Sequence, residues 1–187
     1  LEDGESTVTR VNASDNYPAK WALVGAMNPC PCGYLTDPDK QCICSNNQIA
    51  NYRWRLSWPL LDRVDMYIEV PKVPTEDFRA SKATLAESSK EVQIRVQAAR
   101  NIQLERFTWM GISSNSEMSS KDIKSLCILD AESEWILQNA VKTMNLSARS
   151  YYRILKFSRT IADLENSVDI QVNHVLESLS YRKREEN

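Results

Sequence analysis

Residues 27–34 read MNPCPCGY and directly follow a continuous apolar segment, AKWALVGAM, at positions 19–27. A short apolar run of this kind is typical of a buried strand, and Asn28 with the proline after it marks the end of that strand. Upstream, residues 6–11 (STVTRV) have the alternation of a strand, and residues 13–16 (ASDN) have turn-forming side chains. The sequence therefore predicts a hairpin that runs into a buried strand.

A further strand is expected beyond the cysteine-rich segment. Residues 45–63 (SNNQIANYRWRLSWPLLDR) open with residues suited to helix capping and are interrupted at Pro59, which indicates a short helix. Residues 64–74 (VDMYIEVPKVP) then place Val64, Met66, Ile68 and Val70 at alternate positions before two prolines. This pattern predicts a strand over 64–70.

The second half of the chain differs in composition, because Lys, Glu, Gln, Ser and Ala dominate from about position 73. Residues 88–107 place Val92, Val96, Ala99 and Ile102 on one stripe of a helix. Residues 125–144, 145–165 and 168–182 also have helical spacing, and Ser147 is a suitable cap for the third of these four segments. We expect an α/β plus all-α protein, with an α/β part over residues 1–72 and a bundle of about four helices over residues 73–187.

Composition limits the class of protein. The 187 residues include 42% hydrophobic side chains, enough for a buried core, and the formal net charge of −2 gives no overall basic field for nucleic acid. We find neither a run of roughly 20 apolar residues nor the order of a signal peptide, so we expect a cytoplasmic protein without a membrane span. The absence of an initial Met suggests part of a longer protein.

Four of the five cysteines, Cys30, Cys32, Cys42 and Cys44, form two C-x-C pairs nine residues apart. The fifth, Cys127, lies in an apolar run, and we expect it to be a small core residue. Two such pairs can supply four thiolates to a tetrahedral zinc ion, and the intervening glycine, proline and aspartates allow the loop to close. We favour structural Zn²⁺. A metal-free thiol-rich loop is the alternative, and a redox pair fits less well because redox motifs have C-x-x-C spacing at a helix start.

Three polar residues are candidates for a site that binds an anion or a nucleotide. Asn28 lies where a strand would present it at a sheet edge, Arg63 follows a helix stop, and Arg149 lies in the first turn of a helix, where positive charge opposes the helix dipole. Each also has an ordinary explanation as a turn residue, a local ion pair or an exposed arginine. His174 is the only histidine, and we interpret it as a satisfied or solvent-facing helix residue.

The order of these segments resembles a known family. The runs LEDGESTVTRVNASDNYPAKWALVGAMNPCPCGY, CICSNNQIANYRWRLSWPLLDRVDMYIEVP and SARSYYRILKFSRTIADLE are similar to the carboxyl-terminal part of magnesium-chelatase-like AAA+ ATPases. Within that family the closest group is the ComM-type competence proteins, and minichromosome-maintenance helicases are more distant relatives. The resemblance implies the end of an AAA+ core, with hairpin, sensor strand and finger strand, followed by a helical lid.

The resemblance also implies roles for individual residues. Asn28 matches the sensor-1 asparagine that orients the attacking water, Arg63 matches the arginine finger that reaches a neighbouring subunit, and Arg149 matches the sensor-2 arginine of the lid. It further implies ATP with Mg²⁺ as cofactor, a homo-oligomeric ring (a hexamer) as the assembly, and DNA as the substrate that is moved. Arg10 and Lys20, which flank the hairpin, are then candidates for DNA contact.

Two departures from the family pattern affect these expectations. Trp58 stands where relatives have a small residue, which can reshape a subunit interface without removing Arg63. No glycine is followed by the Lys-Ser/Thr of a phosphate-binding loop, and no apolar strand ends in Asp-Glu. We therefore expect no ATP hydrolysis from this chain alone. A zinc-stabilised helical adaptor without catalysis and a true magnesium chelatase subunit remain the alternative functions.

Overall fold

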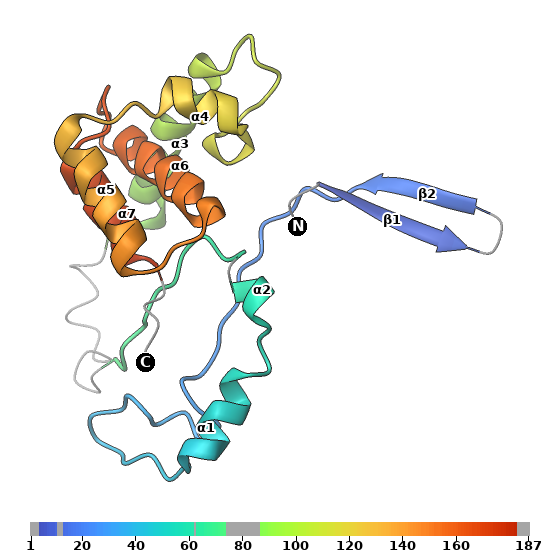
Figure 1. Ribbon diagram of the computed structural model, residues 1–187, viewed down its shortest axis with the longest axis vertical. Coiled ribbons are helices and arrows are strands. Elements are labelled where there is room, and N and C mark those ends of the chain that lie inside the picture. Colours follow the sequence, from blue (N-terminus) through green and yellow to red (C-terminus); the bar gives the residue numbers. More distant parts are fainter. Residues whose placement is uncertain (1–3, 11–12, 62, 74–86, 183–187) are drawn as a thin grey trace. The chain divides into compact units, whose positions relative to one another are not determined.

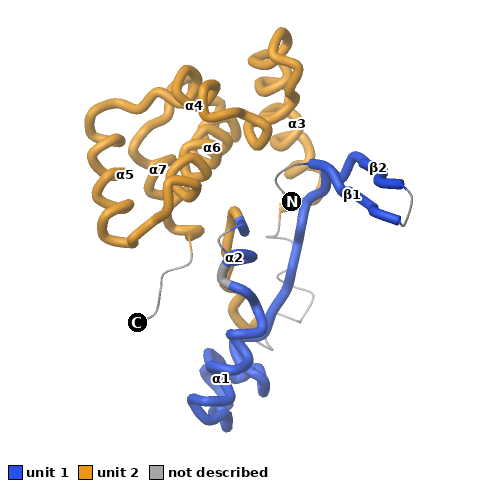
Figure 2. Tube along the Cα trace, turned by 45° about the vertical axis from the view of Figure 1, so that its right-hand side comes forward, with its two compact units in different colours: residues 1–64 blue, residues 65–187 orange. Residues whose placement is uncertain are grey.

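The computed structural model describes residues 4–10, 13–61, 63–73 and 87–182. It divides into two compact units, residues 1–64 and 65–187 (Figure 2). Among the described residues, the first unit contains a two-stranded sheet and two short helices, and the second contains the remaining helices (Figure 1). The expected mixture of an α/β part and a helical part is confirmed, whereas the domain boundary after residue 72 stays a prediction.

The hairpin consists of β1 (Glu5–Arg10) and β2 (Ala13–Pro18), which pair antiparallel with Glu5 opposite Pro18 and Arg10 opposite Ala13. A cross-strand hydrogen bond from Thr7 Oγ1 to Asn16 Oδ1, 2.7 Å long, supports this register. The expected turn at residues 13–16 is wrong, because these residues form part of β2. Residues 11 and 12, which connect the strands, lie outside the described residues.

The expected strands at 19–27 and 64–70 are also wrong for this structure. Neither segment forms a strand, and in the described part of the chain only β1 and β2 pair with each other. Their apolar side chains consequently stay accessible: Val24 is 94% exposed and Val70 is 84% exposed. A run of apolar residues favours a strand only when a neighbouring strand supplies the backbone hydrogen bonds.

Two short helices follow the cysteine segment. Helix α1 (Asn46–Arg53) begins with a capping box, in which the Ser45 hydroxyl accepts from the Gln48 N–H and the Gln48 side chain accepts from the Ser45 N–H. Helix α2 (Trp58–Leu61) carries Pro59 in its first turn, where a missing N–H costs no helical hydrogen bond. The expected cap and the interruption near Pro59 are confirmed.

The second unit is helical in its described residues. It contains α3 (Ser89–Arg106), the 3-10 helix η3 (Asn115–Glu117), α4 (Ser120–Leu126), α5 (Ala131–Thr143), α6 (Ala148–Leu164) and α7 (Val172–Ser180). Helices α5 and α6 each end before a residue in the left-handed conformation, Asn145 and Asn166. The expected cap Ser147 accepts from the Ser150 N–H at 3.1 Å and is confirmed.

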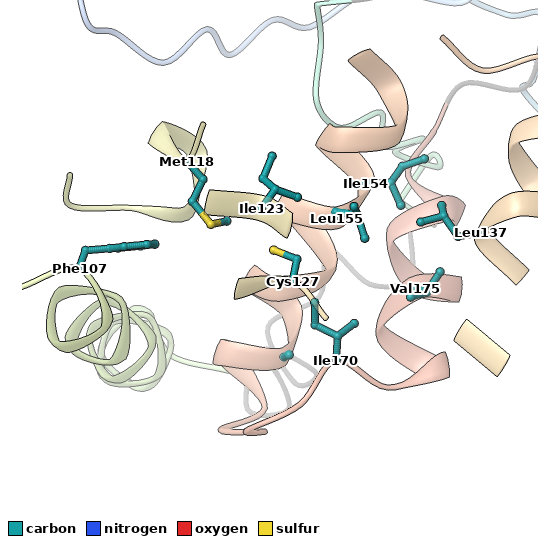
Figure 3. Packing of buried hydrophobic residues seen from close by; sticks show 10 residues of the cluster. Phe107, Met118, Ile123, Cys127, Leu137, Ile154, Leu155, Ile170 and Val175 are labelled. Carbon is teal, nitrogen blue, oxygen red and sulfur yellow. The ribbon is translucent and has the colours of Figure 1, made fainter. Parts of the chain in front are cut away.

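Helix α6 lies at the centre of this unit and contacts α3, α4, α7 and η3, while α5 packs against α7. The buried cluster draws on all of these elements or the loops beside them (Figure 3): Phe107, Met118, Ile123, Cys127, Leu137, Ile154, Leu155, Ala162, Ile170 and Val175. The expected stripe of α3 is only partly buried, because Ala99 belongs to the interior but Val92 and Val96 remain exposed. No helix in the described ranges is both long and apolar enough to cross a membrane.

Candidate functional site

The four paired cysteines converge in the first unit. The Sγ atom of Cys30 lies 3.3 Å from that of Cys32 and 3.7 Å from that of Cys42, and Cys32 and Cys42 are 3.5 Å apart. All four Sγ atoms, including that of Cys44, lie within 4.8 Å of one another. A tetrahedral zinc ion with Zn–S bonds of about 2.3 Å requires sulfur separations of about 3.8 Å. The donor set and its spacing therefore fit a Cys₄ zinc centre.

Backbone N–H groups surround these sulfurs. The pKa of Cys32 is lowered to about 6, chiefly because the Tyr34 N–H donates a hydrogen bond to its Sγ. The Ile43 N–H and the adjacent thiols lower this pKa further, whereas burial acts to raise it. The pKa of Cys44 is raised, mainly by burial. One thiolate is thus stabilised by the loop itself. A second thiolate among these closely spaced sulfurs would repel the first, so deprotonation of more than one cysteine needs a cation to balance the charge.

The loop between the cysteine pairs is fixed by its own turn chemistry. Gly33 has φ of +82°, in the region that favours glycine, and its N–H donates to the Cys30 carbonyl at 3.0 Å. The Asp37 carboxylate accepts from the N–H groups of Asp39 and Lys40. The Lys40 ammonium lies 3.9 Å from the centre of the Tyr34 ring. These contacts hold both C-x-C pairs in a closed loop.

Asn28 and Arg63 are both in the first unit. The Asn28 amide lies beside the cysteine loop, with Cγ and Nδ2 each 3.9 Å from the position that a Cβ on Gly33 would take. The Arg63 guanidinium is half-buried and donates from Nη1 to the Pro59 carbonyl at 2.9 Å, so it is held against the turn of α2. Asp62 and the side chain of Trp58 lie outside the described residues.

Arg149 is in the other unit, exposed in the first turn of α6, directly after the Ser147 cap. Arg10 and Lys20 lie at opposite ends of the hairpin. Arg10 ends β1, whereas Lys20 follows β2 and its Cγ lies 3.3 Å from the position that a Cβ on Gly4 would take. The five strand steps between Glu5 and Arg10 correspond to about 17 Å, so the structure does not bring the two basic residues together.

The helical unit contains a buried polar network that was not predicted from the sequence. The Asp163 carboxylate on α6 is inaccessible and accepts from Arg106 of α3 in a bidentate pair, from Asn115 Nδ2 at 2.8 Å and from Arg159 Nε at 3.1 Å. Although burial alone would raise it, the pKa of Asp163 is lowered by the hydrogen bonds from Arg106 and Asn115. In the sequence, the four-residue spacing of Arg159 and Asp163, which places both on one side of a helix, could have indicated this network.

The remaining two residues singled out from the sequence are structural. His174 is fully buried, accepts from the Gln171 N–H at Nδ1 and lies 3.0 Å from a Glu165 oxygen at Nε2. Its interpretation as a satisfied helix residue is confirmed. Cys127 is 6% exposed in the helical core, as expected for a small apolar residue, and burial is the main reason that its pKa is raised to about 11.

Comparison with known proteins decides the family. The profile described as magnesium chelatase, subunit ChlI C-terminal, matches residues 86–182, and that described as magnesium chelatase, subunit ChlI, matches residues 1–78. The chain belongs to the magnesium chelatase family. This result confirms the resemblance seen in the sequence. It also places the chain in a AAA+-type ATPase family.

Curated relatives of this magnesium chelatase-family chain agree. It is 40% identical to the competence protein ComM of Haemophilus influenzae and 36% identical to the uncharacterized protein YifB of Escherichia coli, over 97% of this chain in each case. It is also 33% identical to the uncharacterized protein Mb2921c of Mycobacterium bovis over 98% of this chain. The matches cover 34%, 35% and 35% of those relatives, so the chain spans about a third of their length.

Proposed function

We propose that this chain supplies the sensor, arginine-finger and lid parts of an ATP-hydrolysing ring that remodels DNA by branch migration or helicase-like movement in natural transformation or recombination. The observation that carries the proposal is the match of both halves of the chain to magnesium chelatase profiles. The match to a relative named a competence protein supports the DNA branch over insertion of magnesium into a porphyrin. The phosphate-binding loop and the acidic Mg²⁺ ligands belong to a part of such a protein that residues 1–187 do not contain.

In this proposal Asn28 orients the water that attacks the γ-phosphate of ATP, and Arg63 stabilises the negative charge of the transferring phosphoryl group in the neighbouring subunit. The position of Asn28 directly after the apolar segment 19–27 supports the first role. The attachment of the Arg63 guanidinium to the Pro59 carbonyl supports the second, because a positioned cation loses less conformational freedom when it meets the phosphate.

Arg149 is proposed to report the nucleotide state from the lid. Its place in the first turn of α6 supports this role, because the arginine and the positive end of the helix dipole would both attract a phosphate there. Arg10 and Lys20 are proposed to contact the DNA backbone. Their separation along the hairpin supports contacts with two different phosphates, which would make binding fall with salt concentration.

A structural Zn²⁺ held by Cys30, Cys32, Cys42 and Cys44 completes the proposal. The fit of the four Sγ atoms to tetrahedral geometry supports it. Zinc bound by four cysteines has no open position for a substrate, so we assign it no chemical step.

Mixing two inactive variants tests the roles of Asn28 and Arg63 in the longer protein that carries the phosphate-binding loop. We expect Arg63→Ala and Asn28→Ala each to reduce ATP turnover, with a loss of about 10³-fold or more for the arginine and ATP binding retained. If Arg63 acts on the neighbouring subunit, rings assembled from both variants regain activity. At equal mixing about a quarter of the interfaces combine an intact Asn28 with an intact Arg63.

Arg95→Ala is the matched control, because Arg95 is an exposed α3 residue paired with Glu87 and such pairs contribute little. Its ATP turnover should equal that of the wild type. Unchanged turnover in Arg63→Ala would refute the finger role, and mixed rings that stay inactive would show that Arg63 does not act between subunits. A helical adaptor without catalysis predicts no ATP turnover in the longer protein at all.

A further inference from the structure

The two units differ in what holds them together. The helical unit contains the whole ten-residue buried cluster, whereas Cys30 is the one buried apolar side chain among the described residues of 4–64. Helix α1 buries none of its residues. A segment of this length without an apolar core needs a covalent or metal cross-link, or contacts with other parts of a protein, to be ordered. The cysteine cluster is the cross-link that this segment carries.

The local structure from Asn28 to Arg53 is built around the sulfurs. The turn at Gly33 closes the first cysteine pair, and the N–H groups of Tyr34, Ile43 and Cys44 donate to the sulfurs of Cys32 and Cys42. The Ser45 cap that begins α1 follows Cys44 directly. Pro31, between the first two cysteines, faces the side chains of α1 across a shallow pocket. Both ends of the segment thus depend on where the sulfurs lie.

We propose that Zn²⁺ at the four cysteines folds residues 28–53 as a metal-dependent module, and that the metal thereby sets the position of Asn28 and the start of α1. The helical unit folds without it, because it has an apolar core of its own and includes none of these four cysteines. This inference rests on the proposed zinc site, but it does not depend on ATP hydrolysis.

The link to Asn28 is geometric. Its amide lies beside Gly33, whose left-handed backbone forms the turn that closes the Cys30–Cys32 pair, with the Gly33 N–H donating to the Cys30 carbonyl. Without an ion the four sulfurs have no common ligand, and two isolated C-x-C turns cannot hold that backbone. Loss of zinc therefore releases the residue that the proposed function places beside the γ-phosphate. The metal is a positioning element of the nucleotide site.

Hydrogen exchange measured by mass spectrometry on the whole 187-residue chain tests the module, with Zn²⁺ alone as the added ligand. Elemental analysis should find about one zinc per chain. With zinc, amides in 28–53 should be protected. After chelation they should exchange at least about tenfold faster, and adding Zn²⁺ back should restore protection, while amides in 89–180 stay unchanged throughout.

Two variants sharpen the test. The double variant Cys42→Ser/Cys44→Ser should contain no zinc. Its amides in 28–53 should exchange as fast as those of the wild-type chain after chelation. Cys127→Ala, which removes the cysteine outside the cluster, should keep full zinc content and zinc-dependent protection. Protection of 28–53 that persists without zinc, or loss of protection throughout 89–180 on chelation, would overturn the inference. Neither result would touch the subunit-mixing test, so failure of the module and failure of the proposed ATPase roles are separate outcomes.

Discussion

Replacing Asp163 by Asn tests how the helical unit is held together. The substitution preserves size but removes the charge that lies between Arg106 and Arg159, whose side chains are 17% and 4% exposed. Asn also presents an NH₂ group where a carboxylate oxygen had accepted hydrogen bonds. Breaking a buried ion pair by removing one partner costs about 3–5 kcal/mol, because the other partner is left as an uncompensated charge. That is a large part of the roughly 5–15 kcal/mol that stabilises a typical domain.

The pH dependence provides a second signature. Because the folded pKa of Asp163 lies below its ordinary value of about 3.9, the carboxylate contributes stability above that pH and loses it as the pH falls through the lowered folded pKa. The wild-type protein should therefore lose stability steadily below about pH 5. The Asp163→Asn variant should lose less over the same pH range, because it has no carboxylate at position 163 to protonate.

Thermal unfolding followed by circular dichroism at pH 7 measures the effect. A loss of at least about 3 kcal/mol should lower Tm by roughly 12 °C or more for a unit of this size. Asp169→Asn is the control, because Asp169 is exposed and its replacement should change stability by less than about 0.5 kcal/mol. A Tm of Asp163→Asn equal to that of the control would refute the conclusion that this network stabilises the unit.

Two further predictions concern local chemistry. With Zn²⁺ bound at pH 7, iodoacetamide should leave Cys30, Cys32, Cys42 and Cys44 unmodified, because their sulfurs are metal ligands; after chelation all four should react, whereas buried Cys127 should stay unmodified in both states. Equal modification of the four cysteines by mass spectrometry with and without Zn²⁺ would contradict this. Ser147→Ala should destabilise the helical unit by about 1 kcal/mol in urea unfolding, because the Ser150 N–H loses its acceptor; exposed Ser180→Ala is the control, and equal effects would argue against the cap.

The locally encoded features of this protein could be predicted from its sequence. The helix caps at Ser45 and Ser147, the helical spacing of the second half and the pairing of four cysteines depend on residues that are close in the chain. The proposed site residues rest instead on resemblance to a family, because no spacing rule distinguishes a sensor asparagine from a turn asparagine. Their family is confirmed, and their roles stay proposals.

Strand assignment failed for a physical reason. Apolar periodicity indicates that a segment favours burial, but a strand also needs a neighbouring strand to share its backbone hydrogen bonds. In the described part of the chain neither 19–27 nor 64–70 is paired with another strand. In the hairpin, by contrast, the turn-forming residues 13–16 were drawn into β2 because β1 supplied the partner.

The sequence by itself determined the helices, their caps and the set of four thiols, because each depends on side chains within a few residues of one another. Only the tertiary structure decided that Arg106 meets Asp163, 57 positions further along the chain, and that Asn28 lies against Gly33 of the cysteine loop. Contacts of this kind follow from how whole elements pack, and helix periodicity records which face is buried but not which partner that face will meet.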